Sequence, residues 1–415
     1  MDGRPVTVTR RKFLAGSTAT LGGLTAWRYA HAQAKEVVLG AVVALTGPNA
    51  AWGQRTWNGF QLACDLVNDQ GGIKSLGGAK LKPFVVDTES KPEVAGAQTE
   101  KAIQRGAVAI TGTNQSASTI VATQIAERES VPFVCATDVD PLITARGFKY
   151  TFRTSPVVES YARDLLAYIK ELGEKSGKPA RKLAVLSENS IVGQSSIEAS
   201  SKVGKELGYE IVEMATYDAS KTQNFASYIS KFKGAGVEVF IGHNKPSDAI
   251  LITRTMKELN WNPMAYGGIL GGHVSNEYVN ALGRDADNVL CTTSWSADAD
   301  IPGLKPLAQK YQERFKEQLD STSAGGFTAF AVLWDSLERA GSTDRKKLRD
   351  AIAATQLKTG DKMYMQLRGA KFTPAGENLL AGGLVFVVKD KEWVTVAPKE
   401  YAKATAPYPK PKWGA

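Results

Sequence analysis

Short apolar runs alternate with segments of helical periodicity along most of the chain. In its first part the apolar runs fall at 37–44, 84–87, 108–111 and 131–135, and the helical segments at 56–68, 92–105 and 118–128. Strands that are apolar throughout are typical of a parallel sheet whose two faces are covered by helices. This part of the chain therefore predicts an α/β lobe with a doubly wound parallel sheet.

A second series of the same kind begins after an extended segment at 150–154. The expected strands are 183–187, 211–215, 237–241, 264–267 and 289–293, and the expected helices are 161–172, 196–207, 225–232 and 247–259. Further on, the pattern predicts helices at 304–318, 328–340 and 346–355 and strands at 363–367 and 384–388. The order predicts two similar α/β lobes, followed by a surface tail at 400–415 that is rich in Lys, Pro and Ala.

The N-terminus has the composition of an export signal. A pair of arginines at 10–11 precedes a weakly apolar stretch at 15–26, and the small-x-small sequence Ala-His-Ala follows at 30–32. This order predicts a twin-arginine signal peptide at 1–32 that is cleaved after Ala32, so that the twin-arginine translocase delivers the mature protein to the periplasm. The alternative is an uncleaved helix behind a chance pair of arginines. No later segment is apolar for long enough to span a membrane, so we expect a soluble product.

The net charge of the 415-residue chain is +9, and part of it belongs to this leader. Without residues 1–32, which hold five basic residues and one acidic residue, 46 basic and 41 acidic residues remain, a net charge of +5. This excess is scattered, without the basic run or aromatic platform that would suit a single-stranded nucleic acid. Nucleic acid is therefore not an expected partner.

Side chains for catalysis are scarce. Of three histidines His31 leaves with the signal, so His243 and His273 remain. There is no G-x-S-x-G nucleophile motif, no H-E-x-x-H or C-x-x-C metal motif and no glycine-rich phosphate loop. The sequence argues against a hydrolase, a metalloenzyme and a nucleotide-binding protein, and it predicts no cofactor and no metal.

Three cysteines, Cys64, Cys135 and Cys291, are widely spaced along the chain. At most one disulfide could form in the periplasm, and the sequence leaves all three pairings open. The alternative is that the three are small buried apolar residues.

Small hydroxyl and amide residues gather after two predicted strands, at 113–119 and 136–138. In doubly wound sheets ligands lie at the carboxyl ends of the strands, where the first N–H groups of a helix can hold an anion or a carbonyl. Such residues suit the binding of polar groups without reaction. The alternative is that Ser116 or Ser118 caps a helix and Asp138 forms a turn.

Several short motifs carry a resemblance to a known family. They are Leu-Thr-Gly-Pro-Asn-Ala-Ala-Trp-Gly at 45–53, Asn58-Gly59, Val67-Asn68 with Gly71-Gly72-Ile73, Pro-Phe-Val at 132–134, Pro141-Leu142-x-Thr144 and Tyr150-x-Phe152-Arg153-Thr154. In order and spacing, over nearly all of the mature chain, the sequence resembles the periplasmic branched-chain amino-acid binding proteins of ABC transporters.

The resemblance implies a type I periplasmic binding protein, with two doubly wound parallel-sheet lobes, a three-strand hinge and a ligand in the cleft. Lobe 1 would comprise 36–156 and 296–366, and lobe 2 would comprise 157–295 and 367–399. The protein would be a monomeric, non-enzymatic receptor that passes a small-molecule solute to an ABC permease at the inner membrane. The alternatives are a sensory protein that presents its ligand to a membrane receptor and, less favoured, a periplasmic enzyme on the same scaffold.

The resemblance also implies the residues of the site. Ser116, between Gln115 and Ala117, falls on the family serine that holds a carboxylate, and Trp52 falls on an aromatic position that covers the ligand. Ile269 stands where amino-acid binders have an acidic partner for the ammonium group of the ligand. The remaining candidate positions are Thr137, Asp138, Val139, Asn189, Val192 and His243.

A buried ammonium group without its partner would cost several kcal/mol. Since Ile269 cannot pair with an ammonium group, we expect a carboxylate with an apolar or aromatic body, or a neutral amide-like solute. Asp138 could supply the missing charge from the first lobe, which keeps an amino-acid-like ligand as an alternative.

Overall fold

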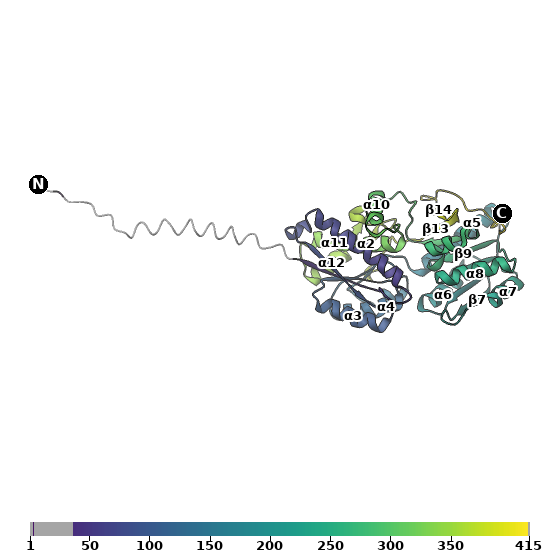
Figure 1. Ribbon diagram of the computed structural model, residues 1–415, viewed down its shortest axis with the longest axis horizontal. Coiled ribbons are helices and arrows are strands. Elements are labelled where there is room, and N and C mark those ends of the chain that lie inside the picture. The colour runs from purple at the N-terminus through teal and green to yellow at the C-terminus, as the bar shows by residue number, and fades with distance from the viewer. Residues whose placement is uncertain (1–2, 4–35, 414–415) are drawn as a thin grey trace.

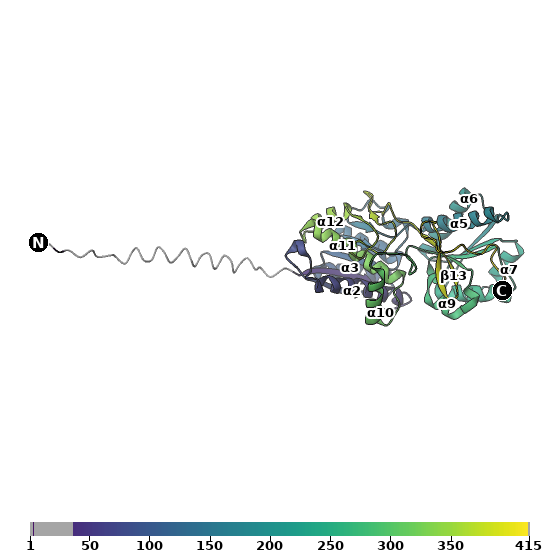
Figure 2. The ribbon, with the colours of Figure 1, turned by 90° about the horizontal axis from the view of Figure 1, so that it is seen from above.

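The computed structural model describes residue 3 and residues 36–413, so the predicted signal peptide at 1–32 lies almost wholly outside the described residues. Figures 1 and 2 show two lobes side by side along the long axis of the molecule, with a narrow connection between them. Purple and light-green helices share the left-hand lobe of Figure 1. Segments that are far apart in the sequence therefore build one lobe.

The first lobe is built on a parallel sheet of five strands in the order β2-β1-β3-β4-β5. Its strands are β1 Val37–Val43, β2 Leu81–Asp87, β3 Ala109–Thr113, β4 Phe133–Cys135 and β5 Thr151–Arg153. Its helices are α2 Ala50–Asp69, α3 Pro92–Gln104, α4 Ser116–Arg128, α10 Leu304–Phe315, α11 Ser321–Ala340 and α12 Arg345–Ala353. Nearly every residue of β1, β3, β4 and β5 is buried, which is the reason that these strands are apolar throughout.

Helices α2 and α11 cross at very short distance in this lobe. A Cβ atom on Gly59 would lie 2.2 Å from the carbonyl oxygen of Ser323, and one on Gly326 would lie 2.2 Å from that of Thr56. Only glycine permits this approach of two backbones. Helix α11 starts earlier than the predicted 328, because Asp320 caps it by accepting hydrogen bonds from the N–H groups of its first turn.

The second lobe holds a sheet of seven strands in the order β14-β13-β10-β9-β8-β6-β7. The parallel strands are β6 Lys182–Glu188, β7 Glu210–Tyr217, β8 Val239–His243, β9 Ala265–Ile269 and β10 Leu290–Thr293. Its helices are α5 Val158–Lys175, α6 Ile191–Glu206, α7 Ala226–Gly234, α8 Pro246–Glu258 and α9 Asn276–Leu282. An antiparallel hairpin, β13 Leu384–Lys389 and β14 Glu392–Ala397, closes one edge, and β14 was not predicted. The prediction of two α/β lobes with parallel sheets is confirmed.

The predicted strand at 363–367 is wrong. Lys362 and Met363 have φ angles of 46° and 68°, which no strand accommodates, and the chain forms a 3-10 turn at Asp361–Met363 instead. Two very short strands, β11 Gln356–Leu357 and β12 Ala370–Lys371, pair on either side of it.

Three segments connect the lobes, after β5, after β10 and before β13. Before the third, the ring of Phe372 still packs on Phe152 of β5, with ring centroids 5.3 Å apart. The Asn378 amide donates hydrogen bonds to the carbonyl oxygens of Thr154 and Gly369, at 3.2 Å and 3.0 Å. We therefore propose that the third crossing follows Asn378, later than the expected change of lobe after residue 366.

The C-terminal segment, expected as a surface tail at 400–415, lies along the second lobe. The Ala406 N–H donates to the Tyr168 hydroxyl at 3.0 Å, and the Trp413 indole donates to the Trp261 carbonyl at 3.0 Å. Lys410 is only 6% exposed, and its ammonium group lies over the Trp413 ring. The described part of this segment is thus anchored along its length.

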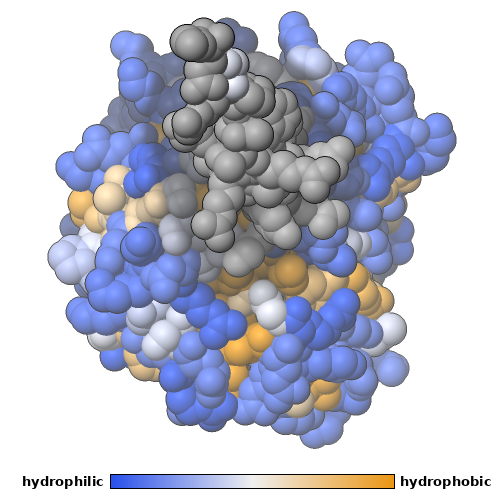
Figure 3. All heavy atoms as spheres, turned by 90° about the vertical axis from the view of Figure 1, so that its left-hand side faces the viewer, coloured by the Kyte–Doolittle hydropathy of each residue, from blue (hydrophilic) through white to orange (hydrophobic). Residues whose placement is uncertain are grey.

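Hydrophilic side chains cover most of the visible surface at the end of the molecule shown in Figure 3, with a smaller group of apolar side chains below the centre. Within 36–413, no helix has both the length and the apolar composition that crossing a bilayer requires. Cys64, Cys135 and Cys291 are all buried and unpaired, as the alternative to a disulfide requires. Burial raises the pKa of each thiol.

Candidate binding site between the two lobes

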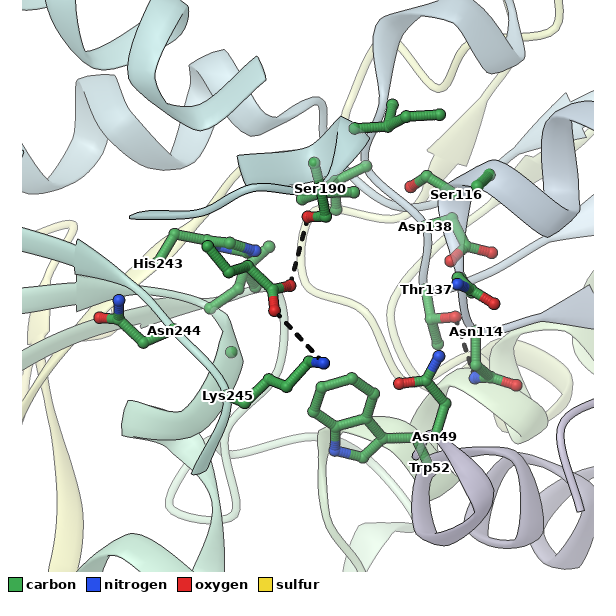
Figure 4. Close-up of a pocket in the computed structure, with 18 of the residues that line it drawn as sticks. Asn49, Trp52, Asn114, Ser116, Thr137, Asp138, Ser190, His243, Asn244 and Lys245 are labelled. Carbon is green, nitrogen blue, oxygen red and sulfur yellow. Dashed lines mark hydrogen bonds and ion pairs between the residues drawn. The ribbon is translucent and has the colours of Figure 1, made fainter. Parts of the chain in front are cut away.

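A cavity of about 430 Å³ opens between the lobes, lined by residues from both. The first lobe contributes mainly the loops that follow β1, β3 and β4, with Ser90 after β2 and the first turn of α11, and the second contributes the loops that follow β6, β7, β8 and β9 and the end of β10. These are the carboxyl ends of parallel strands, where an open α/β sheet leaves room for a ligand. Figure 4 shows the side chains of both walls converging on this space.

The first-lobe wall is centred on the N-terminus of α4. Its first turn has N–H groups without helical partners, and its first residue, Ser116, is 2% exposed. The Ser116 hydroxyl makes no hydrogen bond to any described residue. N–H groups of a helix N-terminus, together with this hydroxyl, form a site for a carboxylate or another acceptor-rich group.

Asn114 precedes this turn with a φ angle of 71°. Its amide nitrogen donates to the hydroxyls of Thr56, at 2.6 Å, and Thr137, at 3.1 Å. Its side-chain oxygen, Oδ1, is buried without a hydrogen-bond partner among the described residues. These hydrogen bonds hold the loop that leads into α4 in place. Thr137, one of the two acceptors, also lines the cavity.

Asp138 lines the cavity but is engaged inside the first lobe. Its Oδ2 accepts hydrogen bonds from the Thr119 hydroxyl at 2.7 Å and from the Thr113 N–H at 3.3 Å. Burial raises the pKa of this carboxyl group. The main role visible for Asp138 is therefore to tie the loop after β4 to the start of α4.

The second-lobe wall carries an ion pair that the sequence analysis missed. Glu188, the last residue of β6, and Lys245, which precedes α8, lie with Oε2 and Nζ 3.7 Å apart. Ser190, the cap of α6, donates from its hydroxyl to Glu188 Oε1 at 3.2 Å and accepts from the Gly193 N–H at 3.1 Å. Figure 4 shows the Lys245 side chain extending into the cavity on the side of Trp52.

His243, the last residue of β8, is a neutral acceptor in this wall. Its Nδ1 lies 2.7 Å from the Ile269 carbonyl oxygen, so Nδ1 carries the proton. Burial lowers the pKa of His243, and the neutral ring keeps a lone pair on Nε2. Its neighbour Asn244 instead points away from the cavity in Figure 4 and donates to the Leu186 carbonyl at 3.1 Å.

Ten of the eleven predicted site residues line the cavity. They are Trp52, Gln115, Ser116, Ala117, Thr137, Asp138, Val139, Asn189, Val192 and His243. Ile269 does not, because its side chain is fully buried in the core of the second lobe. Leu270 and Gly271, one and two residues further along the loop, line the cavity in its place.

Two polar contacts join the lobes through residues outside the lining of the cavity. Arg55 on α2 forms an ion pair with Glu277 on α9, with Nη2 and Oε1 3.6 Å apart. The hydroxyl of Ser195 on α6 donates to Asp140 of the first lobe at 2.7 Å. Both contacts require the lobes to be close together.

The chain is similar to known binding proteins over most of its length. The model of the periplasmic binding protein family matches residues 36–389. A Leu/Ile/Val-binding protein homolog of Brucella suis is 24% identical over 371 residues, 88% of this chain and 92% of the relative. A second such homolog, from Brucella abortus, is 26% identical over 380 residues, 89% of this chain and 92% of the relative.

Solved structures share the fold. A leucine-binding protein of Thermotoga maritima superposes with a TM-score of 0.73 at 22% identity, covering 87% of this chain and 98% of its own. A solute-binding protein of R. palustris in complex with benzoate gives a TM-score of 0.74 at 19% identity, covering 89% of this chain and 99% of its own. A branched-chain amino acid transporter substrate-binding protein of Streptococcus pneumoniae, in complex with isoleucine, gives 0.73 at 19% identity, covering 87% and 100%.

Proposed function

Since the chain belongs to the periplasmic binding protein family, we propose that it captures a small carboxylate between its lobes and passes it to an ABC permease. The observation that carries this proposal is the wall built by the N-terminus of α4. Its first N–H groups are donors without partners and the Ser116 hydroxyl can also donate, while Asp138, the carboxylate of that wall, accepts instead from Thr113 and Thr119. A carboxylate satisfies such a wall, and an ammonium group does not.

The body of the ligand would be apolar or aromatic. Trp52 reaches the cavity from the first turn of α2, and Val139, Val192 and Leu270 add apolar surface from both lobes. An aromatic ring stacked on an indole and covered by aliphatic side chains gains burial without needing polar partners. The benzoate complex of a protein with the same fold supports this ligand class.

An amino acid is the second candidate. The Leu/Ile/Val-binding homologs support it, and Glu188 supplies an acidic side chain on the second lobe although Ile269 does not. The ammonium ion of Lys245 lies 3.7 Å from that carboxylate, however, and would repel the ammonium group of an amino acid. We therefore favour the carboxylate without an α-amino group.

Calorimetric titration of the mature protein with benzoate, leucine and isoleucine tests the proposal. We expect benzoate to bind, and Ser116→Ala to weaken it by about tenfold to a hundredfold, because a hydrogen bond to a charged group contributes roughly 1.5–3 kcal/mol. Ser200→Ala is the matched control, since Ser200 is also fully buried with an unpaired hydroxyl but lies outside the cavity. Binding of leucine but not benzoate would exclude the favoured ligand class.

We further propose that the protein reaches the periplasm through the twin-arginine translocase and acts as a monomer. The arginine pair at 10–11 supports this route, and the family membership supports the periplasmic location. The intact mass of protein from the periplasmic fraction tests the location and the cleavage site, because cleavage after Ala32 leaves a chain that begins at Gln33.

A further inference from the structure

The ion pair in the second-lobe wall leaves hydrogen-bonding capacity unused. At 3.7 Å the Lys245 Nζ and the Glu188 Oε2 are too far apart for a hydrogen bond. Within residues 36–413, Nζ makes no hydrogen bond, and Oε2 accepts none, while Oε1 accepts one from Ser190. Both groups therefore present free sites to the cavity they line.

The two charges are also partly withdrawn from water. The Glu188 side chain is 16% exposed and that of Lys245 is 39% exposed, so each feels the other more strongly than an ordinary surface pair does. A second carboxylate bound at Lys245 would lie beside Glu188, and a cation bound at Glu188 would lie beside Lys245. Either charge would therefore meet repulsion from one residue as well as attraction to the other.

A neutral group that both donates and accepts avoids this conflict. Its donor fits Glu188 Oε2 and its acceptor fits Nζ of Lys245, and the pair stays neutral. His243 lies at the end of β8, beside β6, and its Nε2 can accept a hydrogen bond from the second N–H of a carboxamide. Hydroxyl and carboxamide groups have this dual character, whereas a hydrocarbon end leaves both charges unsatisfied.

We infer that Glu188 and Lys245 together select solutes whose end remote from the carboxylate carries a hydroxyl or carboxamide group. The inference rests on the proposed function, because the carboxylate is assigned to the α4 wall across the cavity. In Figure 4 Lys245 and Ser190 lie on the second-lobe side, and Ser116 and Asp138 lie on the opposite side. The two walls would thus bind opposite ends of one ligand.

Two matched ligand series test this selection by calorimetry. One comprises benzoate and its para-hydroxy, para-carbamoyl, para-carboxy and para-aminomethyl derivatives, and the other comprises hexanoate and its chain-end hydroxy, carbamoyl, carboxy and amino derivatives. In the wild type we expect the hydroxy and carbamoyl acids to bind about tenfold or more tighter than the unsubstituted acid, and the doubly charged ligands to bind weakest.

Single substitutions of Glu188 and Lys245 should change the ranking of ligand affinities in opposite directions. Glu188→Gln should improve the dicarboxylates relative to the hydroxy acids, and Lys245→Gln should improve the amino acids of the series. The controls are Glu159→Gln and Lys202→Gln, an ion pair at 3.1 Å on the same lobe but outside the cavity, which should keep the wild-type order.

The outcomes separate this inference from the proposed function. If Ser116→Ala weakens every carboxylate but the order is the same in Glu188→Gln and Lys245→Gln as in the wild type, the inference is overturned and the carboxylate site stands. Preference of the wild type for a dicarboxylate or an amino acid also overturns it. If no carboxylate of either series binds the wild type, both proposals fail together.

Discussion

The ion pair between Arg55 and Glu277 provides a direct test of whether ligand affinity depends on closure of the lobes. Arg55 on α2 is 17% exposed and also lies near two carboxylates of its own lobe, Glu317 at 3.4 Å and Asp320 at 3.3 Å. Glu277 on the second lobe is its only interlobe partner within the described chain. Glu277→Gln therefore removes one interlobe attraction and leaves the guanidinium paired.

The magnitude follows from exposure. Glu277 is 49% exposed, so the pair should be worth about 0.2–1 kcal/mol, as exposed pairs are. If the lobes close on the ligand, this energy is part of the binding free energy, and its loss should raise the Kd by roughly 1.4-fold to fivefold. Because the pair is largely at the surface, the effect should disappear at about 1 M salt, where the screening length is near 3 Å.

Calorimetric titrations at low and high salt measure this difference. Glu317→Gln is the matched control, because it removes a partner of the same arginine within one lobe and should leave the Kd unchanged. An equal effect of the two substitutions would refute the reasoning, since Arg55 would then act through its own lobe. A change of tenfold or more in Glu277→Gln that persists at high salt would refute it as well.

Two further predictions concern stability. Burial lowers the pKa of Lys410 to about 8, from 10.5 in the unfolded chain, so between these two pH values mainly the unfolded state holds the proton. The contribution of this group to the free energy of unfolding therefore rises with pH. Lys410→Met should be more stable than the wild type by at most about 3 kcal/mol at neutral pH, and thermal melts between pH 7 and 10 should show this advantage shrink. A Cβ on Gly193 would lie 1.9 Å from the Glu188 carbonyl oxygen, so Gly193→Ala should cost about 1–3 kcal/mol in thermal melts and weaken ligand binding, whereas Gly234→Ala, which meets open space, should do neither.

Much of the fold followed from the apolar pattern because a parallel sheet covered on both faces leaves little choice of residue. The apolar pattern predicted least well those segments whose structure depends on close backbone packing and helix capping. The first turns of α11, Ser321 to Gly326, contain small and polar residues, and they are helical because glycines let α2 approach and Asp320 supplies a cap. The strand predicted at 363–367 is wrong because the chain takes positive φ angles within 360–363, although the apolar residues that follow are typical of a strand.

The candidate site was predictable to the extent that it lies at strand ends. Polar residues directly after β3 and β4 gave Ser116, Thr137 and Asp138. Glu188 ends β6 and Lys245 lies just after β8, but single charged residues at such positions are usually solvated, and nothing local indicated that two residues 57 positions apart would come together. Ile269 is the one predicted position outside the cavity, because its side chain packs in the core of the second lobe. The next residue, Leu270, has a φ angle of 56° and lines the cavity.

The interleaving of the two lobes has a consequence for how the protein folds. The N–H of Lys74 donates to Glu338 across 264 positions of the chain, and β10 of the second lobe pairs with β13 only after the first lobe has received α11. Contacts of such long sequence separation form late and slowly. Neither lobe can complete its core while the C-terminal quarter is still on the ribosome, so both become stable at nearly the same time. A chain that stops before α11 would expose the buried face of α2 and would be a substrate for proteases and chaperones.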